Sequence, residues 1–376
     1  MGEFGSHELT LRGTPEPDEI QCAFTFRSLS RQQKTLKQGE YLGVSSSQMT
    51  NENQIPPKRE LTTEPRLSDK LFQKIVTTGG LSSLLVLGLI FSFLLYQGFD
   101  VLKTQGIHFL TSSQWIAAVD SNNAPDAANS HFGIAAMLIG TILCALIAVV
   151  ISVPISVLTA LFLSFYAPGF IKKVMVTIID LMAAFPSILF GLWGFYVLMP
   201  SAVYWAKLLH KYLGWIPFFK MQAPVYDRSP FIAGLVLAVM MVPIVTSIAR
   251  EIFAQTPPDR IQAAYALGAT RWGMIRAVAF PYGRSGIIGG AMLGLGRAMG
   301  ETVAVYTVLN IVYQINWQVL LGVGGNVAAM IMLKFGESTI LEAKALMAAG
   351  LVLFLVTLVV NSIADFIVER TGKSGR

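Results

Sequence analysis

The sequence predicts an all-α polytopic membrane protein, and two observations lead to this fold class. Of the 376 residues, 53% are hydrophobic and only 13% are charged, whereas soluble domains carry about 25% charged residues. The apolar residues also gather in long runs, and a helix needs about 20 such residues to cross a bilayer. We therefore expect lipid, rather than water, to surround much of this protein.

Six apolar stretches are long enough to span a membrane, at residues 72–96, 131–165, 174–199, 231–254, 286–312 and 343–366. The second is long enough to tilt or to begin outside the bilayer. Pro154, Pro186 and Pro243 fall inside spans, where neighbouring helices can satisfy the carbonyls that a proline frees. We predict a transmembrane domain over residues 70–370 and a short cytoplasmic tail over 371–376.

The segment before the first span differs in composition. Residues 1–69 are polar, contain several prolines and show no sustained hydrophobic period, which is typical of a disordered tail. The opening Met-Gly-Glu-Phe-Gly-Ser-His resembles a cloning junction, so part of this tail is expected to be vector-derived. Met49 is a candidate natural start.

The distribution of Lys and Arg predicts the orientation. Six spans place both termini on one side, which carries fifteen basic residues: Lys58, Arg59, Arg66, Lys70, Lys74, Lys172, Lys173, Arg250, Arg260, Arg271, Arg276, Arg284, Arg370, Lys373 and Arg376. The other side carries seven: Lys103, Lys207, Lys211, Lys220, Arg228, Lys334 and Lys344. Cytoplasmic loops are enriched in basic residues, so both termini are predicted to face the cytoplasm.

The loop between the fourth and fifth spans, residues 257–281, has the pattern of a compact helix–turn–helix. Thr256 is expected to cap a first helix that begins at the following prolines. Gly268 interrupts the helical pattern, Thr270 can cap a second helix, and Pro281 precedes the next span. An ordinary ordered loop is the alternative on these residues alone.

The fifth span contains two charged residues, Arg297 and Glu301. An arginine at the bilayer centre costs about 2.5–3.5 kcal/mol on insertion scales, and such residues usually face a cavity or pathway. The i, i+4 spacing also allows an ion pair on one helix face, which would hold helices together. An Arg in such a cavity would suit an oxyanion, because its planar fork donates two hydrogen bonds to neighbouring oxygens. Paired Glu301 would hold this Arg and moderate its contact, so that the anion is released. Asp180, in the third span, is expected to partner a basic side chain.

Several other site types find no support in the sequence. The two cysteines, Cys22 and Cys144, and the four scattered histidines show no disulfide or metal-ligand spacing. Gly372-Lys373-Ser374 matches the end of a phosphate-binding loop, but Ile367 stands where the first glycine is required. We expect no ATP site, metal, cofactor or catalytic residues in this chain.

Four stretches of the sequence resemble a known family. Gln262-Ala263-Ala264, Gly268 and Val278-Ala279-Phe280-Pro281 follow the spacing of the E-A-A…G…I-x-L-P signature of ABC importer permeases, although Gln262 and Phe280 depart from the usual residues. The run from Arg284 to Thr302, and the stretches around Asp180–Ile188 and Phe253–Pro257, are similar to the PstC-type permeases of bacterial phosphate importers. The likeness covers about residues 70–370.

The resemblance implies a type I ABC importer permease fold and a set of partners. Such permeases pair with a homologous PstA-type permease, a cytoplasmic PstB-type ATPase homodimer and an extracytoplasmic PstS-type phosphate-binding protein. It also implies roles for two groups of residues. Arg297, Glu301 and Thr302 would line the substrate pathway, and the ATPase would dock on Arg260, Gln262, Ala263, Ala264, Gly268 and Ala269.

We therefore predict a multi-pass subunit of the bacterial inner membrane that forms half of an alternating-access pathway for inorganic phosphate. ATP hydrolysis would reside in the separate ATPase. An ABC permease for another oxyanion, such as sulfate or molybdate, or for an amino acid is the closest alternative. An ion-coupled secondary transporter is a more distant one, and a membrane enzyme is the weakest, since no catalytic grouping is evident.

Overall fold

A computed structural model describes residues 67–118, 126, 129–221 and 223–373. The predicted disordered tail lies almost entirely outside the described residues, as do residues 374–376 of the predicted cytoplasmic tail. The chain divides into two units, Met1–Lys74 and Ile75–Arg376. The second unit holds the helical bundle.

Helix α2 (Leu67–Gln105) contains the first predicted span and extends beyond it at both ends. Most of its apolar side chains are exposed, and only Gly98 and Val101 are buried. Gly98 allows close packing on α14, because a Cβ added there would lie 2.9 Å from the Cα of Ala348. The exposed apolar surface is the kind that lipid or another membrane helix covers.

A short capping region precedes the second span. It consists of α3 (His108–Thr111) and the strands β1 (Trp115–Ile116) and β2 (His131–Phe132), which pair antiparallel with Trp115 opposite Phe132. Helix α4 (Ala135–Leu161) follows and continues into the π-helical segment η2 (Phe162–Tyr166). The second span thus begins four residues later than predicted, because His131 and Phe132 belong to the strand pair.

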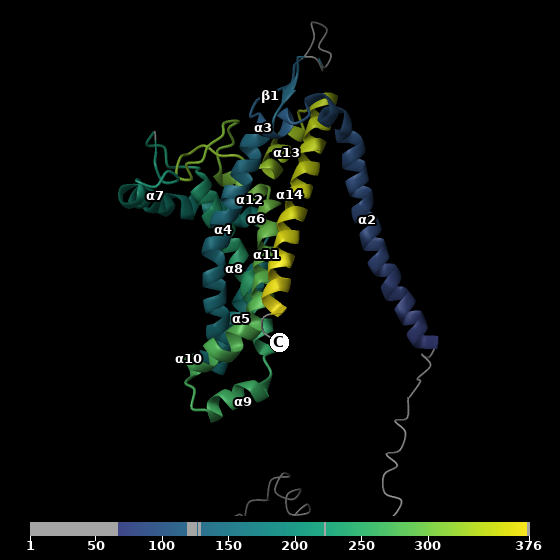
Figure 1. The fold of residues 1–376 in the computed structure, drawn as a ribbon. Coiled ribbons are helices and arrows are strands. Elements are labelled where there is room, and N and C mark those ends of the chain that lie inside the picture. Colours follow the sequence, from purple (N-terminus) through teal and green to yellow (C-terminus); the bar gives the residue numbers. More distant parts are fainter. Residues whose placement is uncertain (1–66, 119–125, 127–128, 222, 374–376) are drawn as a thin grey trace, which may run out of the picture. The chain divides into compact units, whose positions relative to one another are not determined.

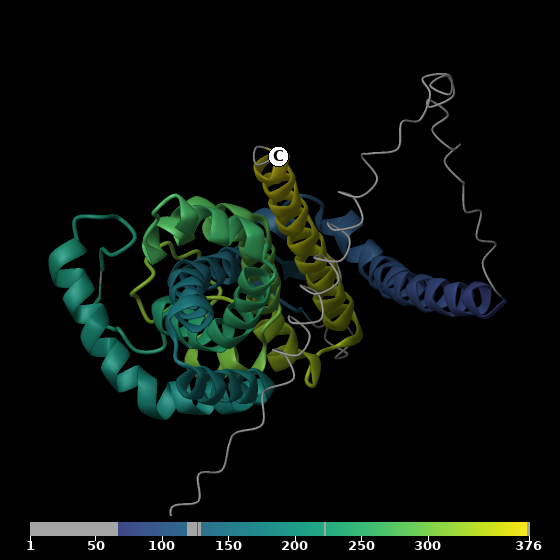
Figure 2. The same cartoon turned by 90° about the horizontal axis from the view of Figure 1, so that it is seen from below.

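The third predicted span is a broken helix. It comprises α5 (Gly169–Ala184), α6 (Ser187–Trp193) and the π-helical η3 (Gly194–Leu198), and the chain then enters α7 (Met199–Leu213). The break falls at Phe185 and Pro186, because proline disfavours the helical conformation of the residue before it; Phe185 has an extended ψ of 137°. Figures 1 and 2 show α7 running across the bundle axis rather than along it.

Helix α8 (Pro230–Ala254) forms the centre of the bundle and matches the predicted fourth span to within one residue. Ser229 caps it, since its hydroxyl accepts a 3.5 Å hydrogen bond from the backbone N–H of Ile232. The buried face of α8 packs on α4, where Gly234 lets Ile147 approach closely. Pro154 and Pro243 lie inside α4 and α8, as predicted.

The fifth predicted span is also divided. After α9 (Pro258–Ala266), the segments α10 (Arg271–Met274), η4 (Ile275–Ala279) and α11 (Phe280–Met299) follow without interruption. Pro281 therefore lies inside this continuous helical run rather than ahead of it, just after the π-helical turn η4. A short α12 (Val303–Val308) follows the break at residues 300–302.

The chain ends with α13 (Val327–Phe335) and the long α14 (Ile340–Lys373). Among the described residues, five helical stretches are long and apolar enough to cross a membrane: Leu67–Gln105, Ala135–Tyr166, Ser187–Leu213, Pro230–Ala254 and Ile340–Ala364. Helix α11 does not meet this test, because glycines and two arginines dilute its apolar character. The all-α membrane architecture is confirmed, while a count of six spans stays a prediction.

Candidate functional site

Arg297 occupies the last turn of α11, and its side chain is exposed on the surface of the single chain. It lines a cavity of about 570 Å³ together with Ile244, Gly289, Met292, Leu293, Gly296 and Asn361. Gly289 and Gly296 have no side chains to fill the cavity on the α11 side. The Arg297 guanidinium therefore has open space beside it. Arg297 thus lies in an open cavity, which is the arrangement that the insertion cost of a membrane-buried arginine favours.

Glu301 lies outside α11, because the helix ends at Met299 and Gly300 is its C-cap residue. Its side chain is buried, and Oε1 accepts a 3.4 Å hydrogen bond from the backbone N–H of Ala304, in the first turn of α12. A carboxylate at a helix N-terminus stabilises the unpaired N–H groups there. Thr302, the third predicted pathway residue, is half-buried and precedes α12 without capping it.

The expected ion pair between Arg297 and Glu301 is absent. The i, i+4 geometry requires both residues to be in one helix, and the end of α11 falls between them. The ion pairs within 4.0 Å in the described part of the chain join Lys334 to Glu342 and Lys344 to Asp100. Arg297 therefore keeps its guanidinium donors available to a ligand in the cavity.

Asp180 does not form the expected partnership with a basic side chain. It lies in α5, is exposed, and has no ion-pair partner within 4.0 Å among the residues that the structure describes. Helix α5 contributes no buried residue to the single chain. A second membrane subunit is the kind of neighbour that would cover such a face.

The 257–281 loop forms a helix–turn–helix at the end of the bundle opposite β1 (Figure 1). Gly268 makes the turn in a left-handed conformation with φ of 80°, and the hydroxyl of Thr270 accepts a 3.1 Å hydrogen bond from the N–H of Gly273. Both predictions are confirmed. The predicted cap by Thr256 is wrong, because Pro257 is the N-cap residue and the buried hydroxyl of Thr256 has no hydrogen-bond partner among the described residues.

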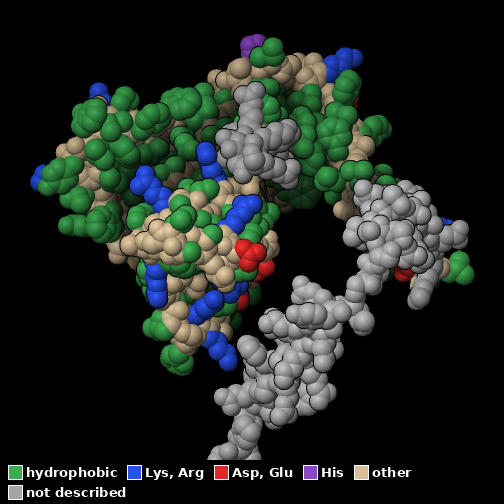
Figure 3. Space-filling model, turned by 60° about the horizontal axis from the view of Figure 1, so that its bottom comes forward, with side chains coloured by type: hydrophobic (Ala, Val, Ile, Leu, Met, Phe, Trp, Pro, Cys, Tyr) green, Lys and Arg blue, Asp and Glu red, His purple; other side chains and the backbone are tan. Residues whose placement is uncertain are grey.

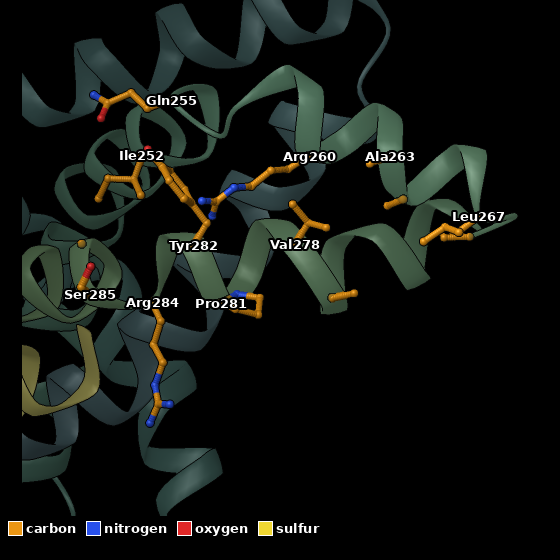
Figure 4. Close-up of a pocket in the computed structure, with 14 residues that line it drawn as sticks. Ile252, Gln255, Arg260, Ala263, Leu267, Val278, Pro281, Tyr282, Arg284 and Ser285 are labelled. Carbon is orange, nitrogen blue, oxygen red and sulfur yellow. The ribbon is translucent and has the colours of Figure 1, made fainter. Parts of the chain in front are cut away.

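The six residues expected to contact the ATPase cluster on this helix–turn–helix. Arg260, Gln262, Ala263 and Gly268 are exposed, whereas Ala264 and Ala269 are half-buried. Helix α9 lies beside the η4–α11 segment, and a groove of about 980 Å³ separates them. In Figure 4, Arg260 and Tyr282 extend into this groove from its two walls, whereas Arg284 points away from α9.

A family comparison gives the context for this geometry. Residues 152–373 match the family of binding-protein-dependent transport system inner membrane components. This region contains the Arg297 cavity and the complete 257–281 loop. The chain is a member of this permease family.

Curated relatives extend the match to nearly the whole described chain. The "phosphate transport system permease protein PstC 2" of Mycobacterium tuberculosis, like that of Mycobacterium bovis, is 39% identical over 302 residues, which cover 80% of this chain and 91% of the relative. The PstC protein of Xylella fastidiosa is 34% identical over 333 residues, covering 88% of this chain and 99% of the relative.

A solved structure supports the fold. The permease is similar to a chain in the crystal structure of a bacterial alginate ABC transporter in complex with its substrate-loaded periplasmic protein, with a TM-score of 0.50 and 16% identity. The likeness covers 82% of the permease and 99% of that chain. It confirms the predicted ABC importer permease fold. The family match also confirms the predicted location in the inner membrane.

The permease has functional candidates that sequence reasoning missed. Asn361 of α14 faces the Arg297 cavity, and a Cβ added to Gly296 would lie 3.9 Å from both polar atoms of the Asn361 amide. Leu267 is 89% exposed at the turn beside Gly268, and Trp272 is 61% exposed. The signals in the sequence were an amide, Asn361, inside an apolar run and two large apolar residues, Leu267 and Trp272, in a basic loop.

The cavity chemistry suits an oxyanion. Arg297 offers charged donors in a fixed fork, and Asn361 adds an amide that can donate or accept. In the described part of the chain, no group of three His, Cys, Asp or Glu side chains could hold a metal ion.

Proposed function

We propose that this chain is the permease subunit of an ATP-driven importer and forms half of the pathway for inorganic phosphate. The observation that carries the proposal is the exposed guanidinium of Arg297 in a membrane cavity, without a carboxylate within 4.0 Å among the described residues. The names of the curated relatives, which are phosphate transport system permeases, support the choice of cargo. An arginine whose donors are not taken by a carboxylate suits divalent hydrogen phosphate.

The partners follow from the same family. A homologous PstA-type permease would supply the other half of the pathway, and a PstB-type ATPase homodimer would dock on the 257–281 loop. A PstS-type binding protein would deliver phosphate from outside. The exposed side chains of Leu267 and Trp272 support a docking surface there, because burial of such apolar area stabilises an interface.

The proposed topology places the 257–281 loop and both termini in the cytoplasm. Exposed Lys and Arg side chains surround the end of the bundle that carries α9 and α10, as Figure 3 shows, which agrees with the positive-inside rule. Six crossings would then be made by α2, by α4 with η2, by α5 with α6 and η3, by α8, by α11 with α12, and by α14.

One continuous helical rod, formed by α10, η4 and α11, would couple the ATPase to the pathway. The helical segments α10, η4 and α11 are continuous from Arg271 to Met299, a length of about 40 Å at 1.5 Å per residue. Arg297 lies at the far end of this rod from the docking loop. Movement of the loop on ATP binding would therefore tilt the helix that carries Arg297 and open the cavity alternately to the two sides.

Glu301 would contribute to selectivity. Hydrogen phosphate can donate a proton in a hydrogen bond to a carboxylate, whereas sulfate at neutral pH has no proton to donate. The other carboxylate oxygen of Glu301 would accept a hydrogen bond from hydrogen phosphate but would repel sulfate. The position of Glu301 directly after α11, four residues beyond Arg297, supports this role.

The experiment that tests the proposal is reconstitution of the chain with the PstA-type, PstB-type and PstS-type partners in liposomes. We expect ATP-dependent uptake of radiolabelled phosphate that excess sulfate, molybdate and amino acids do not suppress. Uptake of sulfate or molybdate instead would show a correct transporter class with a different cargo. Uptake driven by an ion gradient without ATP would contradict the proposal.

A further inference from the structure

A second cavity lies beyond α12 and contains its own arginine. Its volume is about 420 Å³, and it is lined by Leu192, Phe195, Tyr196, Arg228, Tyr306, Thr307, Leu309, Asn310, Ile311 and Leu333. These residues come from α6, η3, α12, α13 and the loops before α8 and after α12. We propose that this Arg228 cavity is an outer oxyanion site, which receives phosphate before it reaches Arg297. The proposal rests on the proposed function.

The backbone at Arg228 is held in an unusual conformation. In the described part of the chain, Arg228 is the non-glycine residue with a positive φ, of 50°. Such a conformation costs about 1–2 kcal/mol for a residue with a Cβ. The neighbouring structure enforces it, since the Arg228 carbonyl accepts a 3.0 Å hydrogen bond from the N–H of Asn310, and the next residue, Ser229, is buried as the cap of α8. A glycine would be easier to accommodate, so a long charged side chain in this conformation points to a function.

The guanidinium of Arg228 is oriented but not neutralised. It lies 5.1 Å from the centroid of the Phe195 ring, in a cation–π contact. No carboxylate lies within 4.0 Å of it in the described part of the chain, although Asp227 is its neighbour in sequence. Stacking on a ring occupies the flat face of a guanidinium and leaves its N–H groups at the edge available.

The rest of the lining completes an anion site. Thr307 donates its hydroxyl proton to the Ala304 carbonyl, and the Asn310 amide donates to the Gly322 carbonyl, so these two side chains are fixed. Tyr306 also lines the cavity and is partly exposed, and its phenol can act as a further donor. The combination of a charged fork, a phenol and an apolar floor suits a compact tetrahedral anion, and none of the described residues that line the cavity is acidic.

The two arginines lie at opposite ends of one short segment. Arg297 is in the last turn of α11, Glu301 follows it, and α12 begins at Val303 and carries Tyr306 and Thr307 into the Arg228 cavity. Figure 1 shows α12 and α11 succeeding one another along the bundle. Helix α12 has six residues, about 9 Å at 1.5 Å per residue. The chain segment that joins the two cavities is therefore short, and sites that hand over a ligand must each bind weakly enough to release it.

The site also gives a role to one of the basic residues that depart from the positive-inside rule. Arg228 belongs to the loop that carries four of the seven basic residues on the predicted outer side, with Lys207, Lys211 and Lys220. The same chemistry could serve a free phosphate ion or the phosphate of a lipid headgroup. We commit to the free ion, because the cavity contains a fixed, paired set of polar groups rather than a flat basic surface.

The test uses variants that remove the Arg228 side chain but keep its backbone conformation. Arg228→Asn and Arg228→Gly remove the guanidinium but tolerate a positive φ, so both are expected to fold. Lys220→Gln removes an exposed charge from the same loop, outside the cavity, and is the matched control. Each is reconstituted with its partners in liposomes, and phosphate uptake is measured against the concentration of phosphate-loaded binding protein, together with ATPase activity.

We expect Arg228→Asn and Arg228→Gly to lower the initial uptake rate about tenfold, the effect of losing one charge-assisted hydrogen-bond partner. ATPase activity should persist, and Lys220→Gln should transport within about twofold of the wild type, since surface charges contribute little. Uptake by both Arg228 variants equal to that of Lys220→Gln would overturn the proposal. A defect that vanishes in liposomes of purely zwitterionic lipid would also overturn it, in favour of a lipid headgroup site. Absence of phosphate uptake by the wild type would instead refute the proposed function.

Discussion

Arg297 and Glu301 are four residues apart in sequence, but the end of α11 separates them and each has a different environment. Arg297 is exposed in a cavity, and Glu301 is buried against the first turn of α12, where it accepts a hydrogen bond from Ala304. Two opposite charges that could have cancelled are thereby kept apart. This separation leaves the Arg297 guanidinium without a carboxylate partner among the described residues, which is the arrangement that the proposed anionic cargo requires.

Glu301→Gln tests the role of the carboxylate in selectivity. The amide oxygen of Gln can still accept the hydrogen bond from Ala304, so we expect the free energy of unfolding to fall by less than about 1 kcal/mol. The preference for phosphate over sulfate should decrease, because the charge that repels sulfate is gone. Competition of sulfate against radiolabelled phosphate measures this, with the exposed Glu337→Gln as control. An unchanged preference would remove Glu301 from the selectivity mechanism.

Gly140 lies so close to the backbone of Gly325 that no side chain fits at this position. A Cβ there would lie 2.2 Å from the carbonyl oxygen of Gly325, which is backbone and cannot rotate away. We expect Gly140→Ala to destabilise the protein by at least about 2 kcal/mol, in the range of severe overpacking. Gly88→Ala is the control, since nothing lies within 4 Å of its added Cβ. Thermal unfolding in detergent should show a lowered midpoint for Gly140→Ala alone; equal midpoints would mean that α4 and the 325 loop are not in contact.

Gly268 is required for its backbone conformation rather than for space. Nothing lies within 4 Å of an added Cβ, but φ is 80°. Gly268→Ala should therefore cost about 1–2 kcal/mol locally and displace α9, so that ATP hydrolysis and phosphate uptake become uncoupled. Gly169→Ala, also in open space but without a positive φ, is the control. The ratio of phosphate transported to ATP hydrolysed is the measurement, and an unchanged ratio in Gly268→Ala would argue against a rigid turn.

Tyr313, which stacks on Trp115 of β1, gives the stability of this region a defined dependence on pH. Burial raises the pKa of its phenol from 10.0 to about 12, and the nearby negative charge of Glu342 contributes. Between these values the folded protein retains a proton that the unfolded chain loses, so this contribution to stability is complete below about pH 10 and is lost as the pH rises through 12.

The difference in tyrosinate absorbance between wild type and Tyr313→Phe isolates this one group. We expect its midpoint close to 12, well above that of the exposed tyrosines. Tyr313→Phe should also be less sensitive to alkaline unfolding than the wild type. A midpoint near 10 would show that Tyr313 is in contact with water and that the stack with Trp115 is open.

The sequence was sufficient where local chemistry decides the structure. Helix α8 was predicted to within one residue, because an apolar run is bounded by Ser229 and Pro230 at one end and by Gln255 at the other. Gly268 and Thr270 were predicted correctly, since a left-handed turn and a helix cap depend on the residue type itself.

Other features depended on tertiary structure. The break after Met299 lies inside an apolar run, and Gly300 gave no more signal than the other glycines of that span. The cap at Thr256 failed because Pro257 took that position, and the opposition of Asn361 to Gly296 requires α14 to pack on α11. The Arg228 cavity likewise joins segments more than 100 residues apart, from Leu192 to Leu333, and no local pattern could have shown it.

The most direct test of the central claim is phosphate uptake by Arg297→Gln in the reconstituted assembly, measured beside its ATPase activity and beside the Lys220→Gln control. We expect uptake to fall at least about tenfold, because a charge-assisted hydrogen-bond partner of the anion is lost, while ATP hydrolysis continues and Lys220→Gln transports normally. Uptake by Arg297→Gln at the wild-type rate would contradict the assignment of Arg297 and place the phosphate pathway elsewhere in the bundle.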